Sequence, residues 1–338
     1  MKKKIVLILP LLTFLFLWPS TAAAVPYWLR SGSQVAYFAN GTTERGYGGG
    51  AYYIRNGCIA NLGFQSARLV FRVVNVSGNW VTINVTLVLY GDKSLRWPFS
   101  DVYAYYPSTC NPPFSDPINT TPYTRNNVSL KWSDYGTILT LHGAYRIQLS
   151  TGVTYSMNGQ PYGHTLLFGL YPVSNNTYVV LGVKRLYLND VRILNSTTYV
   201  TYYHNFTGPN VLLLSEPTNL TDPSGASAFL RTVAVFNPGD DMTLGFMGAV
   251  PDLEASLGIG VLTINDNRIM AKPNFSGGKL KKAVAPGIIL YEFSFPKAEK
   301  TNPCSPQLVT APAVSSLWAI LTIAGLLLLA GVLLLRRR

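Results

Sequence analysis

Short runs of alternating apolar and polar residues constrain the fold of this chain more than any other feature of its sequence. From Val81 to Leu89 every odd position is apolar, whereas Asn84 and Thr86 occupy even positions. Successive side chains of a strand point to opposite faces, so this run predicts a strand with one buried face and Asn84 in solvent. Similar runs, rich in tyrosine and β-branched residues, recur along the chain. The sequence predicts an all-β protein, built as an antiparallel β-sandwich or a curved sheet.

Turn signals between these runs predict hairpins. The ranges 67–76 and 81–90 form the clearest pair, and Asn158-Gly159 predicts a second hairpin. A short helical turn is expected at Pro251–Ser256. The proline-rich range 94–127 is expected to form a long irregular loop. Strands are expected at 34–39, 51–55, 67–76, 81–90, 136–141, 145–149, 153–157, 164–170, 178–183, 191–194, 199–203, 229–236, 242–247, 258–264 and 288–295.

Both ends of the chain carry an apolar segment beside basic residues. Lys2–Lys4 precede an apolar run that Ala22–Ala24 follow, which indicates a signal peptide cut after Ala24, with an uncleaved anchor as the alternative. The uncharged range 317–335 rises about 28 Å as a helix, close to the thickness of a bilayer core. Arg336–Arg338 follow it and are expected on the cytoplasmic side. The ends therefore predict a single-pass cell-membrane protein with its bulk outside.

These boundaries give an expected domain organisation. A second proline-rich break, at 205–227, divides the ectodomain, although the two parts are also compatible with one continuous domain. The expected parts are a signal peptide (1–24), a main β ectodomain (25–205), a second β-rich part (206–296), a stalk (297–316), a transmembrane helix (317–335) and a cytoplasmic basic tail (336–338).

The charge of the chain argues against nucleic acid as a partner. The net charge is +12, but Lys2–Lys4 and Arg336–Arg338 supply six of these charges. No basic stripe interleaved with aromatic residues remains between the ends. Charged residues make up only 12% of the chain, against about 25% in a usual soluble domain. Because only 15 residues are acidic, we also expect the ectodomain to tolerate low pH.

Glycosylation motifs offer another source of surface polarity. An Asn-x-Ser/Thr motif without proline in the middle is the acceptor for N-linked glycans in exported chains. The alternative is that an Asn- and Thr-rich β-protein forms such motifs by accident. Ten occur, at Asn40, Asn75, Asn84, Asn119, Asn127, Asn175, Asn195, Asn205, Asn219 and Asn274. We expect a glycoprotein.

The three cysteines fit an oxidising compartment. Cys58 and Cys110 lie in the β-rich part and are the favoured disulfide, although the sequence leaves the other two pairings open. Cys304 lies in the expected stalk and is then a free thiol or an interchain bond.

Motifs for catalysis and for metal or cofactor binding are weak. His142, His164 and His204 match no zinc spacing, and no G-x-S-x-G nucleophile motif occurs. Asp240-Asp241 reads as a turn, and Asp252 with Glu254 is the other acidic pair considered. The glycine run 46–50 lacks the G-K-[ST] ending of a phosphate loop and is expected to be a flexible turn. The sequence predicts no enzyme and no cofactor or metal.

Exposed aromatic residues are the strongest candidates for a contact surface. Tyr103, Tyr105, Tyr106 and Phe114 lie in the proline-rich range, with Trp97 before them. Such residues form contact surfaces for glycan or protein. The favoured interpretation is that they pack this segment onto the sheet.

The segments Tyr27–Tyr37 and Gln148–Gly163 resemble parts of uncharacterised archaeal single-pass, membrane-anchored, β-rich surface glycoproteins. The resemblance implies a curved antiparallel sheet, similar in some of these proteins to lipoprotein-carrier folds, and no catalytic residues. The resulting hypothesis is a surface glycoprotein with a structural, adhesive or envelope role, whose partners are the membrane, its N-linked glycans, and itself or other surface-layer proteins. The alternatives are a module that binds a lipid or other apolar ligand on a curved sheet, and a cell-surface hydrolase.

Overall fold

The computed structural model describes residues 25–42, 48–55, 57–114, 116–173, 177–223, 225, 227–267, 274–276 and 279–296. In this part the prediction of an all-β protein with mostly antiparallel sheet is confirmed. Its single described helix, α2 (Pro251–Leu257), lies at the helical turn expected from the sequence. Among the described residues no helix has the length and apolarity needed to cross a bilayer. The expected signal peptide, stalk, transmembrane helix and basic tail lie outside this part of the chain.

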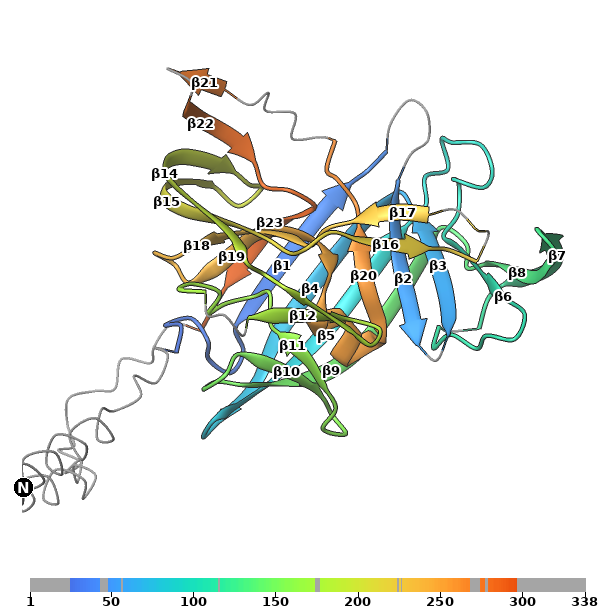
Figure 1. The fold of residues 1–338 in the computed structure, drawn as a ribbon, viewed down its shortest axis with the longest axis horizontal. Helices are drawn as coiled ribbons and strands as arrows, with labels where there is room; N and C mark the ends of the chain where they lie inside the picture. The colour runs from blue at the N-terminus through green and yellow to red at the C-terminus, as the bar shows by residue number, and fades with distance from the viewer. Residues whose placement is uncertain are drawn as a thin grey trace, which may run out of the picture. The chain divides into compact units, whose positions relative to one another are not determined.

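The first sheet is a long series of neighbouring strands that pair antiparallel, except that β14 and β22 are parallel. Figure 1 shows this series curving from β10 and β11 through β4 and β1 to β14 and β22. In spatial order it contains β13 (Lys184–Tyr187), β12 (Tyr178–Leu181), β11 (Pro161–His164), β10 (Val153–Ser156), β9 (Ile138–Gln148), β5 (Trp80–Tyr90), β4 (Ser66–Ser77), β1 (Gln34–Asn40), β23 (Ile288–Ser294), β19 (Met242–Ala249), β18 (Val233–Asn237), β15 (Asn205–Leu214), β14 (Asp190–Val200), β22 (Lys279–Val284) and β21 (Asn274–Ser276).

The second sheet is shorter and branches from the first through a shared strand. It contains β20 (Ile259–Thr263), β2 (Gly49–Arg55), β3 (Cys58–Phe64), β6 (Tyr103–Pro107), β8 (Val128–Asp134) and β7 (Asn119–Arg125). Strand β19 pairs with β23 at Gly245 and with β20 at Gly248. A separate hairpin consists of β16 (Thr218–Thr221) and β17 (Ser227–Leu230).

Both sheets bury side chains in one hydrophobic core. On β5 the apolar side chains at the odd positions 81–89 are at most 1% exposed, whereas Asn84 is exposed, which confirms the predicted faces. Leu62 on β3 and Val261 on β20 belong to the same cluster. In Figure 1, β2, β3 and β20 lie across β4 and β5. The ring of Tyr37 on β1 packs at 5.0 Å from that of Phe246 on β19.

The two predicted hairpins form, but the second differs in one arm. Strands β4 and β5 pair throughout their length, as expected. The second hairpin keeps its Asn158-Gly159 turn, yet its second strand is β11, and the expected strand at 164–170 is wrong. The Leu166 amide and the Thr165 hydroxyl instead donate to the carboxylate of Asp252 on α2. Because the Leu166 amide bonds to Asp252, it does not pair with a neighbouring strand.

The prediction of an irregular loop at 94–127 is wrong in part. Strand β6 lies inside it and pairs with β3 on one side and with β8 on the other. Strand β7 also lies inside it and pairs with β8. Proline lacks a backbone donor and is tolerated at strand ends and on edge strands. Pro107 ends β6 and Pro122 lies on β7, so both prolines occupy such positions.

Sheet pairing also continues across the expected break at 205–227. Strand β15 begins at Asn205 and pairs with β14 and β18. Its proline, Pro209, lies where the register between β14 and β15 shifts, which is a position that proline tolerates. Contacts group the described residues up to Pro296 into one compact unit.

Candidate functional site

The described acceptor asparagines differ in accessibility. Asn40 is only 6% exposed, and its Oδ1 accepts a hydrogen bond from the Thr42 amide. Asn175 lies outside the described residues, as does the side chain of Asn274. The acceptor side chains that reach solvent are those of Asn75, Asn84, Asn119, Asn127, Asn195, Asn205 and Asn219.

The favoured cysteine pairing is confirmed. Cys58 begins β3, Cys110 follows β6, and the two form a disulfide with their Cα atoms 5.5 Å apart. The bond ties the proline-rich segment to the second sheet. Cys304 lies outside the described residues.

The three histidines have separate surroundings. His142 lies on the exposed face of β9, with its Nδ1 3.1 Å from Thr86 Oγ1. His164 Nδ1 accepts from the Tyr178 amide, and burial lowers the pKa of this imidazole. The exposed His204 ring stacks on Phe206 at 3.9 Å. Within the described residues no three His, Cys, Asp or Glu side chains are grouped to hold a metal ion.

The acidic pair on α2 is buried and bonded to the fold. Asp252 Oδ1 accepts hydrogen bonds from the Tyr145 and Thr165 hydroxyls, at 2.7 and 2.6 Å. Glu254 Oε1 is 3.2 Å from Arg55 Nε. Burial raises the pKa of both carboxyls, that of Glu254 to about 7. These partners give both carboxylates a structural role on α2.

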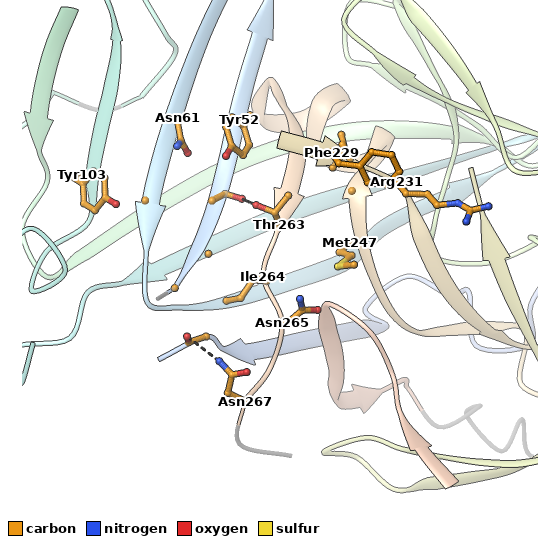
Figure 2. A pocket seen from close by; sticks show the side chains of 17 residues that line it. Tyr52, Asn61, Tyr103, Phe229, Arg231, Met247, Thr263, Ile264, Asn265 and Asn267 are labelled. Carbon is orange, nitrogen blue, oxygen red and sulfur yellow. Dashed lines mark hydrogen bonds between the residues drawn. The ribbon is translucent and has the colours of Figure 1, made fainter. Parts of the chain in front are cut away.

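A pocket opens beside the second sheet. It has a volume of about 560 Å³, within the usual range for small-ligand sites. Figure 2 shows Tyr103, Asn61 and Tyr52 on one side of this pocket, and Phe229 and Arg231 on the other. Strands β2, β3, β6 and β20 supply the first side, and the β16–β17 hairpin supplies Phe229. We call this the glycine-floored pocket.

Glycines form its floor because aromatic rings lie directly against the backbone there. A Cβ on Gly63 would lie 2.2 Å from the Tyr103 ring, and one on Gly49 would lie 2.5 Å from the Phe64 ring. A Cβ on Gly50 would meet Asn61 Oδ1 and Thr263 Oγ1, each at 3.2 Å. The polar ends of Asn61 and Thr263 therefore converge over Gly50. The Thr263 hydroxyl donates to the Gly50 carbonyl at 3.1 Å, as drawn in Figure 2.

A hydrogen-bond chain fixes the orientation of Asn61. The Tyr105 hydroxyl donates its single proton to Asp222 Oδ2 at 2.6 Å, so it accepts from Asn61 Nδ2 at 2.8 Å. Burial raises the pKa of Tyr105, which keeps this hydroxyl protonated. Asn61 Oδ1 then faces away from Tyr105 and has no hydrogen-bond partner among the described residues. The pocket thus holds a nine-tenths buried side chain with a spare acceptor.

An aromatic ladder extends from the pocket along β6 and β8. The Trp132 ring stacks on Tyr103 at 4.5 Å and lies parallel to Tyr105 at 6.2 Å. Trp97 packs against Trp132 at 5.4 Å and is 69% exposed. The sequence singled out Trp97, Tyr103 and Tyr105, and here they gather around Trp132. Tyr106 is buried in the core, and Phe114 packs against Tyr53 and Tyr135.

No motif in the sequence predicts this pocket. Gly49 and Gly50 were expected in a flexible turn, but they belong to β2, so that expectation is wrong for them. The run of glycines was the only signal, because Asn61 and Thr263 are brought to it by strand pairing.

Comparison with known protein families, with curated proteins and with solved structures gives no match for this chain.

Proposed function

We propose that this chain is a membrane-anchored extracellular glycoprotein with a β-sandwich ectodomain and a structural, adhesive or envelope role without catalysis. The observation that carries the proposal is the Cys58–Cys110 disulfide, because such bonds persist in oxidising compartments. The signal-like range 1–24 and the apolar range 317–335 agree with export and anchoring.

The chemistry of the described sites favours this role over the two alternatives. A lipid carrier needs an apolar cavity, whereas the glycine-floored pocket is lined largely by glycine, amide and hydroxyl groups. A glycosidase-like hydrolase needs two carboxylates across an open cleft. Asp252 and Glu254 are instead buried and engaged by Tyr145, Thr165 and Arg55.

Protease accessibility tests the topology. The full chain with a C-terminal tag is produced in a secretory host, and intact cells are treated with protease. We expect loss of the ectodomain while the tag stays protected, and both Cys58 and Cys110 blocked to alkylation. A matched variant truncated before residue 317 is expected in the medium. Recovery of the full chain in the soluble cell fraction, or reduced Cys58 and Cys110, contradicts the proposal.

A further inference from the structure

We propose that the glycine-floored pocket and its aromatic ladder form a binding site for neutral carbohydrate. The inference rests on the proposed surface location and specifies the adhesive role, in which the chain recognises sugars of a neighbouring envelope component. Three features carry it: the charge of the pocket, its hydrogen-bonding groups and the adjoining rings.

The described lining of the pocket favours an uncharged ligand. Of the described residues that line it, only Arg231 carries a charge. The Arg231 guanidinium is already engaged, by Asp190 at 2.8 Å and by the Ser215 carbonyl at 2.7 Å. Burial raises the pKa of Tyr52 and Tyr103, so both hydroxyls stay protonated and neutral. An anionic headgroup or a cation finds no free counter-charge among these residues.

The polar groups of the pocket suit a ligand with many hydroxyls. A buried acceptor without a partner costs about 1–3 kcal/mol, which a ligand donor beside it would recover. Asn61 Oδ1 is such an acceptor, but less than 1 Å² of this atom is accessible, so a ligand donor reaches it only when the Asn61 side chain shifts. Thr263 and Asn265 also line the pocket. A sugar hydroxyl both donates and accepts, so it matches amide and hydroxyl groups equally well.

The aromatic ladder suits the apolar face of a sugar ring. A pyranose ring presents apolar C–H groups on its faces and hydroxyls on its edge. Flat aromatic rings beside a polar pocket bind such an amphipathic ligand, because they bury its C–H face at low entropic cost. Tyr103 belongs to both pocket and ladder, and Trp97 at 69% exposure offers a free ring further along. The arrangement fits an oligosaccharide, with one unit in the pocket and the next against the ladder.

Binding of defined sugars by the full chain in detergent tests this inference. The probes are maltose, cellobiose, lactose and α-1,2-mannobiose as neutral sugars and sialyllactose as the anionic one, titrated by calorimetry. We expect at least one neutral disaccharide to bind. Thr263→Val removes a pocket hydroxyl, Asn265→Trp fills the space, and Trp97→Ala removes the ladder's exposed ring. Each is expected to weaken binding about tenfold.

Two matched variants control for the substitutions themselves. Thr82→Val and Trp80→Ala make the same changes on β5, away from the pocket, and are expected to leave affinity within about twofold. The inference is overturned if no neutral probe binds at about 10 mM, if sialyllactose is preferred, or if control and pocket variants lose affinity equally. Because protease accessibility reports the surface location separately, failure here leaves that proposal standing.

Discussion

Glu254 has a carboxyl group whose ionisation is disfavoured by burial. Its side chain is 4% exposed, and its Oε2 has no hydrogen-bond partner among the described residues. Burial disfavours the carboxylate and raises its pKa from 4.5 to about 7, although the nearby Arg55 opposes this shift. The folded state therefore holds a proton that the unfolded chain releases.

This raised pKa predicts a stability that falls with pH. Between pH 4.5 and 7 the folded state binds more protons at Glu254 than the unfolded state, so the free energy of unfolding decreases as pH rises. The contribution is fully present below about pH 4.5 and is lost by about pH 7 to 8, amounting to about 3 kcal/mol at 1.4 kcal/mol per pKa unit. Chemical denaturation across this range measures it.

Glu254→Gln is expected to flatten that pH dependence. The matched control, Glu292→Gln, replaces a carboxylate that is 47% exposed and is expected to keep the slope. An unchanged slope in the Glu254 variant would show that other groups are responsible. Asp252 and Asp241, whose pKa values burial also raises, act in the same direction.

Accessibility of the acceptor asparagines predicts where glycans attach. Asn84 points to solvent from β5, so a glycan fits there without disturbing the core. Asn40 is 6% exposed and engaged with Thr42, so it is expected to remain unmodified. Peptide mass spectrometry of the chain from a glycosylating host measures the occupancy of each site. Full occupancy at Asn40 with an unmodified Asn84 would contradict this assignment.

At the scale of elements, β19 decides how the two sheets meet. Its pairing changes from β23 to β20 within a few residues, and Gly248 lies at this point. Gly248 has a φ of +103°, and a Cβ there would lie 2.5 Å from Thr232 Cα. Only glycine avoids both the strained backbone and the clash.

Gly248→Ala is therefore expected to destabilise the fold by more than the backbone strain alone, which costs about 1–3 kcal/mol. Gly57→Ala is the matched control, since Gly57 has a φ of +75° with nothing within 4 Å of its Cβ position. Thermal unfolding of both variants compares them. Equal losses would mean that the backbone near Thr232 relaxes and that close packing there is unimportant.

At the scale of the whole molecule, the disulfide limits the freedom of the unfolded chain. Cys58 and Cys110 are separated by 52 residues in the sequence. Loop-closure entropy for such a loop corresponds to about 4 kcal/mol. The double variant Cys58→Ala, Cys110→Ala is expected to lose this amount in denaturant unfolding, and reducing agent should have little further effect on it. A variant as stable as the native chain would show that the bond adds nothing.

Local patterns were sufficient where strands alternate clearly. The buried face of β5, the β4–β5 hairpin and the turn at Asn158-Gly159 follow from side-chain period and turn chemistry alone. Local patterns did not predict the backbone conformation where residues distant in the sequence pair with it. Residues 165–170 form no strand, and Thr165 and Leu166 instead donate hydrogen bonds to Asp252. Strand β6 forms in a proline-rich range because β3 and β8 pair with it on either side.

The sequence by itself determined the all-β class, the faces of its clearest strands and the favoured cysteine pair, since these depend on local periodicity and on few residues. Tertiary structure alone decided the joining of the sheets at Gly248 and the pocket. Asn61 and Thr263 are about 200 residues apart in the chain, and they meet over Gly50 only because β3 and β20 both pair with β2. Long-range strand pairing leaves no local signal, so a site built from it appears only in the folded chain.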